Sequence, residues 1–217
     1  MQINRLLTNL LLLAILLSPT QPFAAAQHTP CCGPISPAGQ HLATFLDNMN
    51  VESLWLANEH VNWETGKPDR GAGYEGPGNH THCSAFAAAA AMRLGVYLLR
   101  PPEHGQSLLS NAQAEWIASP EGQKSGWRPV SDMHQAQHLA NDGHLVLVLF
   151  PNPDPHAPGH VAIVRPSEKS AHALEADGPE IIQAGQHNHN KICVRIGFEN
   201  HPGAWPSGVR YYTHPLS

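Results

Sequence analysis

The sequence predicts one α+β domain in which several helices pack on a mostly antiparallel sheet of about five strands. Helix-type spacing of apolar residues occupies the first half of the chain, and short apolar runs separated by turn residues occupy the second half. This segregation is typical of α+β domains. Without a leader over residues 1–26, about 190 residues remain, which suits one hydrophobic core. We therefore expect a single domain over residues 27–217, with residues 27–62 as its lead-in and first helices.

The first 26 residues have the pattern of a secretory signal peptide. Arg5 precedes an apolar run at residues 10–17, and Ala24, Ala25 and Ala26 provide a cleavage site of small residues. The apolar run is shorter than the roughly 20 residues that cross a bilayer core. We expect an exported protein, located in the periplasm or outside the cell, with no membrane span.

Helices and loops are expected first along the mature chain. Residues 30–40 favour an extended lead-in, and apolar residues between 42 and 56 fit two short helical pieces. Residues 63–78 combine Gly, Pro and charged residues without periodicity, which predicts a long loop. An alanine-rich helix should follow from Cys83 to about Leu94, where the next residue, a glycine, supplies a left-handed cap.

The remaining elements change from helical to strand periodicity near residue 142. Two more helices are expected at residues 107–118 and 131–141, the second with Ser131 as its N-cap. Five strands should follow, at residues 144–150, 160–165, 179–184, 192–198 and 209–213. The apolar positions Phe86, Ala90 and Leu94 would then pack the alanine-rich helix against a face of this sheet.

Cys83 and His160 stand at the starts of a helix and a strand, where their chemistry can be combined. Unpaired N–H groups and the helix dipole at a helix N-terminus favour a thiolate and can stabilise an oxyanion beside it. His160 leads a buried strand and can act as the base for this thiol. If the strand at 179–184 pairs with the His160 strand, Gln183 can accept a hydrogen bond from the imidazole and fix its tautomer. Asn188 is a reserve for this third role.

These residues and their neighbours resemble a known family. Cys83-Ser84-Ala85-Phe86 with its helix is similar to the Asp-Cys-Ser-Gly-aliphatic motif and helix of NlpC-like cell-wall peptidases. Residues 142–148 resemble the Gly-Asp-Leu-Val strand of that family, residues 159–164 its His-Val-Gly-Ile strand, and residues 182–184 its Ile-His-Ala segment. The related CHAP amidases share the order of cysteine, histidine and polar residue.

The resemblance covers residues 81–185, about half of the mature chain, and implies a papain-like cysteine peptidase or amidase. It implies Cys83 as nucleophile, His160 as base and then acid, Gln183 as the orienting residue, and peptidoglycan or a peptide as substrate. It implies no cofactor and no metal, and leaves open an inhibitor protein as a partner. The chain departs from the family at His82, where the family has Asp, at Ala85, where it has Gly, and at Gln183, where it has His.

Two other classes of function remain open. A histidine-rich periplasmic metal-binding protein would use six residues, namely Cys31, Cys32, His80, His82, His187 and His189. A catalytically silent binding domain would keep the same fold with an ordinary thiol. A formal net charge of −5 argues against a nucleic-acid partner.

The four cysteines leave the disulfide connectivity undecided. A bridge from Cys31 or Cys32 to Cys193 would tie the N-terminal segment to a late strand, and a bridge that includes Cys83 is the alternative. The sequence also does not decide which amide bond is cleaved, the oligomeric state or the regulation.

Overall fold

The computed structural model describes residues 30–217 except 72, 77 and 79, so the expected signal peptide lies outside the described residues. The described part has seven helices and six strands: α1 (Pro37–Asn48), α2 (Cys83–Arg93), α3 (Leu109–Ala118), α4 (Pro120–Lys124), β1 (Arg128–Val130), α5 (Met133–Asn141), β2 (Leu145–Phe150), β3 (His160–Val164), α6 (Ala171–Asp177), β4 (Glu180–Gln183), β5 (His189–Cys193), α7 (Val194–Gly197) and β6 (Arg210–His214). None of the described helices has the length and apolar character needed to cross a membrane.

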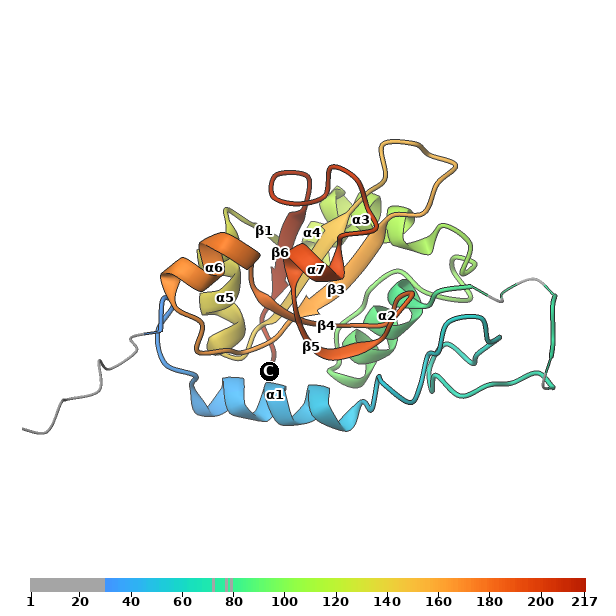
Figure 1. Ribbon diagram of the computed structural model, residues 1–217, viewed down its shortest axis with the longest axis horizontal. Helices are drawn as coiled ribbons and strands as arrows, with labels where there is room; N and C mark the ends of the chain where they lie inside the picture. The colour runs from blue at the N-terminus through green and yellow to red at the C-terminus, as the bar shows by residue number, and fades with distance from the viewer. Residues whose placement is uncertain (1–29, 72, 77, 79) are drawn as a thin grey trace, which may run out of the picture.

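The six strands form one sheet in the order β1-β6-β2-β3-β4-β5, and every neighbouring pair is antiparallel. The predicted α+β class with an antiparallel sheet is therefore confirmed. The short strand β1 and the helices α4 and α6 were not predicted. Figure 1 shows the sheet at the centre, with helices on both sides.

The two faces of the sheet carry separate hydrophobic clusters. Side chains of successive strand residues point to opposite faces, so in β2 the three leucines join a cluster with α1 and α2, and Val146, Val148 and Phe150 join one with α5 and α7. Because helices pack on both faces of the sheet, all six residues of β2 are apolar and buried. The expected packing of Phe86 and Ala90 against the sheet is present, with Leu94 partly buried at the edge of the cluster.

Several predicted boundaries are wrong for identifiable reasons. Instead of an extended segment to residue 40 and two helical pieces, one helix begins at Pro37, because Ser36 accepts a hydrogen bond from the Gly39 N–H and proline suits the first helical turn. Helix α5 is capped by Asp132 rather than Ser131, since its carboxylate accepts from two backbone N–H groups. The strand expected at 192–198 is instead the end of β5 followed by α7.

The disulfide joins Cys31 to Cys32, and Cys83 and Cys193 are free thiols. The expected bridge from the vicinal pair to Cys193 is therefore wrong, and so is the alternative that includes Cys83. Adjacent cysteines need no long loop closure to meet, whereas a bridge to Cys193 would close a loop of more than 160 residues.

Candidate active site

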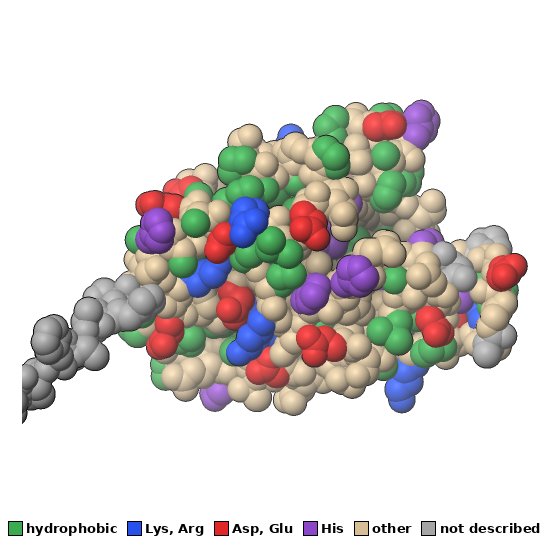
Figure 2. Space-filling view, viewed as in Figure 1, with side chains coloured by type: hydrophobic (Ala, Val, Ile, Leu, Met, Phe, Trp, Pro, Cys, Tyr) green, Lys and Arg blue, Asp and Glu red, His purple; other side chains and the backbone are tan. Residues whose placement is uncertain are grey.

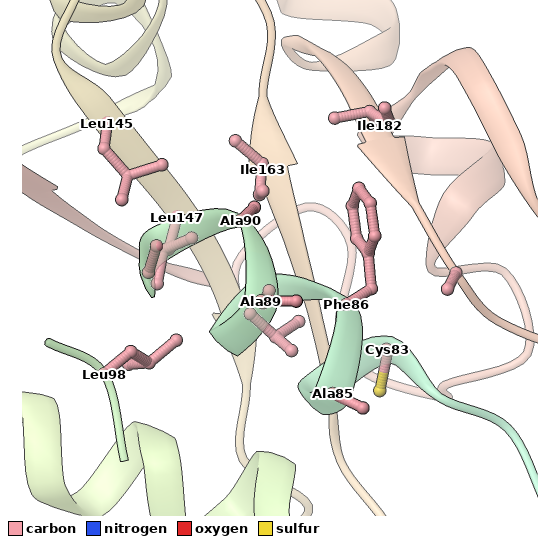
Figure 3. Close-up of a cluster of buried hydrophobic side chains, with 14 of the residues drawn as sticks. Cys83, Ala85, Phe86, Ala89, Ala90, Leu98, Leu145, Leu147, Ile163 and Ile182 are labelled. Carbon is pink, nitrogen blue, oxygen red and sulfur yellow. The ribbon is translucent and has the colours of Figure 1, made fainter. Parts of the chain in front are cut away.

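Cys83 is the first residue of α2, and it belongs to the hydrophobic cluster between α2 and the sheet. The helix ends as expected, with Gly95 in the left-handed region at φ 74°. Figure 3 shows the sulfur at the N-terminal turn, next to Ala85 and Phe86. Every residue of α2 from Cys83 to Ala91 is buried, because alanine side chains let the helix approach the sheet closely. The thiol is thereby held on a rigid element.

Burial controls the protonation of this thiol. Burial raises the pKa of Cys83 above its ordinary value, and backbone N–H groups of Val161, Ser84 and Cys83 itself, which face the sulfur, oppose only part of that shift. The resting site therefore holds a neutral thiol. The N–H groups of the first turn do favour the thiolate, as expected, but the cost of removing the sulfur from water is larger, so the pKa of Cys83 is raised overall.

His160 is the first residue of β3 and is bonded directly to Gln183. The His160 Nε2–H donates to the Gln183 Oε1 at 2.8 Å, and both side chains are buried. The bond forms because β3 pairs with β4 as expected, which places the two residues on the same face of the sheet. An amide oxygen can only accept a hydrogen bond, so this contact puts the imidazole proton on Nε2 and leaves the lone pair on Nδ1.

Two aromatic rings that the sequence reasoning missed enclose the His160 imidazole. The Phe198 ring meets it edge-on with centroids 4.6 Å apart, and the His201 ring stacks on it at 5.1 Å and 14°. Burial, with a smaller effect from the charge of His201, lowers the pKa of His160 to about 4, although the bond to Gln183 acts in the opposite direction. The ring is therefore neutral near pH 7. Phe198 and His201 lie in the turn after α7, where the sequence predicted the end of a strand, so no local pattern pointed to them.

Cys83 and His160 line two adjoining hollows. Cys83 lines a cavity of about 200 Å³, and His160 with Gln183 lines one of about 380 Å³. The two cavities share Thr81, Pro158 and Gly159 as their common wall. Figure 2 shows histidine side chains gathered near the middle of the molecular face in view, and the larger cavity is itself lined by four histidines, His160, His187, His189 and His201.

The Cys83 thiol and the His160 imidazole approach β3 from different sides. The Val161 side chain points into the cluster with α2, whereas the His160 ring packs on Phe198 in the cluster on the other face. The Cys83 sulfur contacts the backbone of Val161, the residue next to His160. Among the residues that the structure describes, no hydrogen bond links this sulfur to the imidazole. His160 is thus bonded directly to Gln183, whereas the Cys83 sulfur contacts the backbone of the residue that follows His160.

Gly159 allows the chain to enter β3 at this point. A Cβ atom there would lie 2.2 Å from the Phe150 carbonyl oxygen and 2.4 Å from the Asn111 Oδ1, so no larger residue fits. Asn111 also donates to the Ala157 carbonyl and accepts from the Asn152 N–H. The loop before His160 is therefore fixed to α3.

His82 directly precedes Cys83 and fastens the start of α2 to an earlier segment. Its Nε2–H donates to the Glu59 carbonyl at 2.8 Å, and the side chain is buried. Its Nδ1 has no hydrogen-bond partner among the residues that the structure describes. Burial lowers the pKa of His82 to about 4, so this side chain is also neutral in the fold. The sequence reasoning gave it no structural task.

Asn188, the reserve for the orienting role, does not touch His160. Its side-chain N–H₂ donates to the carbonyls of Val51, Leu54 and Trp55, and its Oδ1 accepts from the Gly185 N–H. These bonds fasten the turn after β4 to the segment that follows α1. Asn188 is thus part of the scaffold and is not in contact with the imidazole.

Asn188→Ala is expected to destabilise the fold by about 2–4 kcal/mol, because it leaves several backbone groups without their partners and each lost bond costs about 1 kcal/mol. Urea denaturation at pH 7 measures this loss. Asn48→Ala, at an exposed position near the end of α1, is the matched control and should change stability little. Equal stability of the two variants would contradict this assignment.

The six residues that the metal-binding alternative would use do not come together in one site in the described part of the chain. Within the described part of the chain, one group of three potential ligands meets, namely Cys31, Cys32 and His134. The rings of His80 and His82 lie 5.1 Å apart, but they do not belong to that group. His134 was not among the residues expected from the sequence.

The chain matches no protein-family model, and no curated protein matches it with significance.

Proposed function

We propose that this protein is a cysteine hydrolase of papain-like fold that cleaves amide bonds. The observation that carries the proposal is the hydrogen bond between His160, the first residue of β3, and Gln183. The backbone N–H of the next residue in β3, Val161, faces the Cys83 sulfur. A nucleophile at a helix N-terminus, a base on an adjacent strand and a third group that orients the base are the parts that covalent acyl transfer needs.

The geometry supports a mechanism in which His160 acts as a general base. As substrate binds across the shared wall, Nδ1 takes the proton of the Cys83 thiol and the sulfur attacks the amide carbon. The tetrahedral oxyanion is stabilised by backbone N–H groups of the first turn of α2. His160 then gives its proton to the leaving amine, and the carbon–nitrogen bond breaks. Water, deprotonated by the same imidazole, hydrolyses the thioester and restores the thiol.

The resting charge state favours general-base catalysis over a preformed ion pair. The pKa of Cys83 is raised and that of His160 is lowered, both by burial, so both groups are neutral at pH 7. Proton transfer therefore accompanies attack. Catalytic hydrogen bonds are often long in ligand-free sites and shorten in the substrate complex, so the mechanism requires the thiol and the imidazole to come together at the N-terminal end of β3 when substrate binds.

We propose peptidoglycan as the substrate. This step is supported by the resemblance of the Cys83, His160 and Gln183 segments to cell-wall peptidases and amidases, and by the export signal expected at residues 1–26. The cavity beside Cys83 combines uncharged polar side chains, including Thr81, Ser84 and Ser110, with apolar ones from Leu108, Leu109 and Pro158. A mixed lining of this kind can take both the polar backbone and the small apolar side chains of a stem peptide.

Digestion of purified peptidoglycan tests this proposal. The expected result is release of fragments with new amine and carboxyl ends, identified by mass spectrometry, and their loss with Cys83→Ala. If peptidoglycan stayed intact while an unrelated peptide was cleaved, the proposed hydrolase activity would stand and the proposed substrate would be rejected. No cleavage of either would leave a silent binding domain as the better explanation.

Gln183→Ala is expected to lower kcat/KM by about 10- to 1000-fold without abolishing activity, because the amide fixes the imidazole tautomer but supplies no charge. The measurement is steady-state hydrolysis of peptidoglycan fragments. Gly197→Ala should reproduce part of this loss, since a Cβ there would lie 2.7 Å from the Gln183 Oε1. Gly105→Ala, where a Cβ meets nothing within 4 Å, is its control. Full activity of Gln183→Ala would exclude the orienting role.

A further inference from the structure

The vicinal pair Cys31 and Cys32 is held firmly against two helices. The Cys31 N–H donates to the Lys169 carbonyl at 2.9 Å, just before α6. The Cys32 carbonyl accepts from the Nδ1–H of His138 in α5 at 3.1 Å. Figure 1 shows the start of the described chain beside α5 and α6, across the view from α2. The pair therefore occupies a defined position, separate from the candidate active site.

Helix α5 presents histidines to this pair. The sulfurs of Cys31 and Cys32 and a ring nitrogen of His134 all lie within 4.8 Å of one another. His134 and His138 are four residues apart and so share one face of the helix, a spacing that helices use to approach a metal. The Glu175 carboxylate lies 3.9 Å from the His134 Nε2, so an acidic group is close to this ring.

We propose that Cys31, Cys32 and His134 form a metal site that opens when the Cys31–Cys32 disulfide is reduced. In the oxidised chain both sulfurs are used in the S–S bond, so neither is a thiolate ligand. A dithiol reductant supplies two electrons and two protons, the S–S bond breaks to give two thiols, and the reductant becomes a disulfide. Each thiol releases its proton when it binds the metal.

Two thiolates and one imidazole select a borderline or soft cation, and Zn²⁺ fits best. Zn²⁺ binds sulfur at about 2.3 Å in tetrahedral geometry, which places two thiolates roughly 3.8 Å apart. The disulfide places both sulfurs on the same side of the backbone beside His134, and rotation about the two Cα–Cβ bonds after reduction can separate them to that distance. A water molecule completes the fourth position. Mg²⁺ and Ca²⁺ require oxygen ligands, which this group does not provide.

The oxidised and reduced forms of the purified chain provide a matched comparison, because Cys83 and Cys193 are free thiols in both. Thiol titration of the denatured oxidised protein should find two thiols, and four after reduction with a dithiol that is then removed without air. Equilibrium dialysis with ZnCl₂ should show one more equivalent of Zn²⁺ on the reduced form. His134→Ala should weaken this binding by about tenfold or more, and His172→Ala, exposed on α6, should not.

Equal Zn²⁺ binding by the oxidised and reduced forms would overturn the proposal, because exposed histidines would then account for it. Equal affinity of His134→Ala and His172→Ala would overturn it as well. Four thiols in the protein before reduction would reject the redox control. Since none of these measurements uses hydrolysis, they stand apart from the test of the proposed function.

Discussion

Cys83→Ala is expected to bring hydrolysis of peptidoglycan fragments below detection, because no acyl-enzyme can form without the thiol. His160→Ala should come close to the same loss, since the His160 imidazole is the base that Gln183 orients at the start of β3. Removal of either group from a nucleophile–base pair costs on the order of 10⁶-fold in kcat, and the two losses are not additive. The double variant should therefore be no slower than either single variant.

The controls for this prediction depend on how each side chain is packed. Alanine at position 83 continues the alanine-rich face of α2, so the melting temperature should change little. His160→Ala leaves a space between Phe198 and His201, so His160→Phe, which refills that space without a basic nitrogen, separates lost chemistry from lost packing. If Cys83→Ala kept its activity and Cys193→Ser lost it, the nucleophile would be Cys193 and the assignment to Cys83 would be wrong.

The fully buried elements of the fold could be predicted from the sequence. β2, β3 and α2 were placed within a residue or two because each contains an uninterrupted run of apolar or small residues and is followed closely by a glycine or proline. The contact between His160 and Gln183 followed from the pairing of consecutive antiparallel strands. Pairing of that kind is a local rule, so a sequence motif is enough to anticipate it.

The surroundings of the candidate site depend on contacts that are distant in sequence. Phe198 and His201 reach the imidazole only because the chain turns back after β5, where the sequence suggested that a strand continues. The pKa of Cys83 was misjudged because a motif reveals the helix N-terminus but not the depth of burial. The meeting of His134 with the vicinal cysteines spans about 100 residues and has no local signal.

Lowering the pH from 7 to 4.5 is expected to destabilise this protein strongly, through His82 and His160. Each has a pKa of about 4 in the fold, against an ordinary value of 6.5, because each is buried as the neutral form. Between pH 6.5 and 4 the unfolded chain therefore binds protons that the folded chain does not, and stability falls as the pH falls. A difference of 2.5 units corresponds to about 3 kcal/mol for each group at the low end of that range.

Urea denaturation at several pH values measures this dependence. His82→Gln should lower stability at pH 7, because the bond to the Glu59 carbonyl and the ring packing are lost. It should also flatten the slope between pH 6.5 and 4.5, by less than half, because burial also lowers the pKa values of His160 and His201 and these two still titrate. His172→Ala, which removes an exposed histidine, should leave the slope unchanged. The aspartates with lowered pKa values, among them Asp47 and Asp132, lose their contribution only near and below pH 4, so they do not account for a slope in this range. A wild-type stability that stays constant from pH 7 to 4.5 would show that neither histidine is buried as the neutral form.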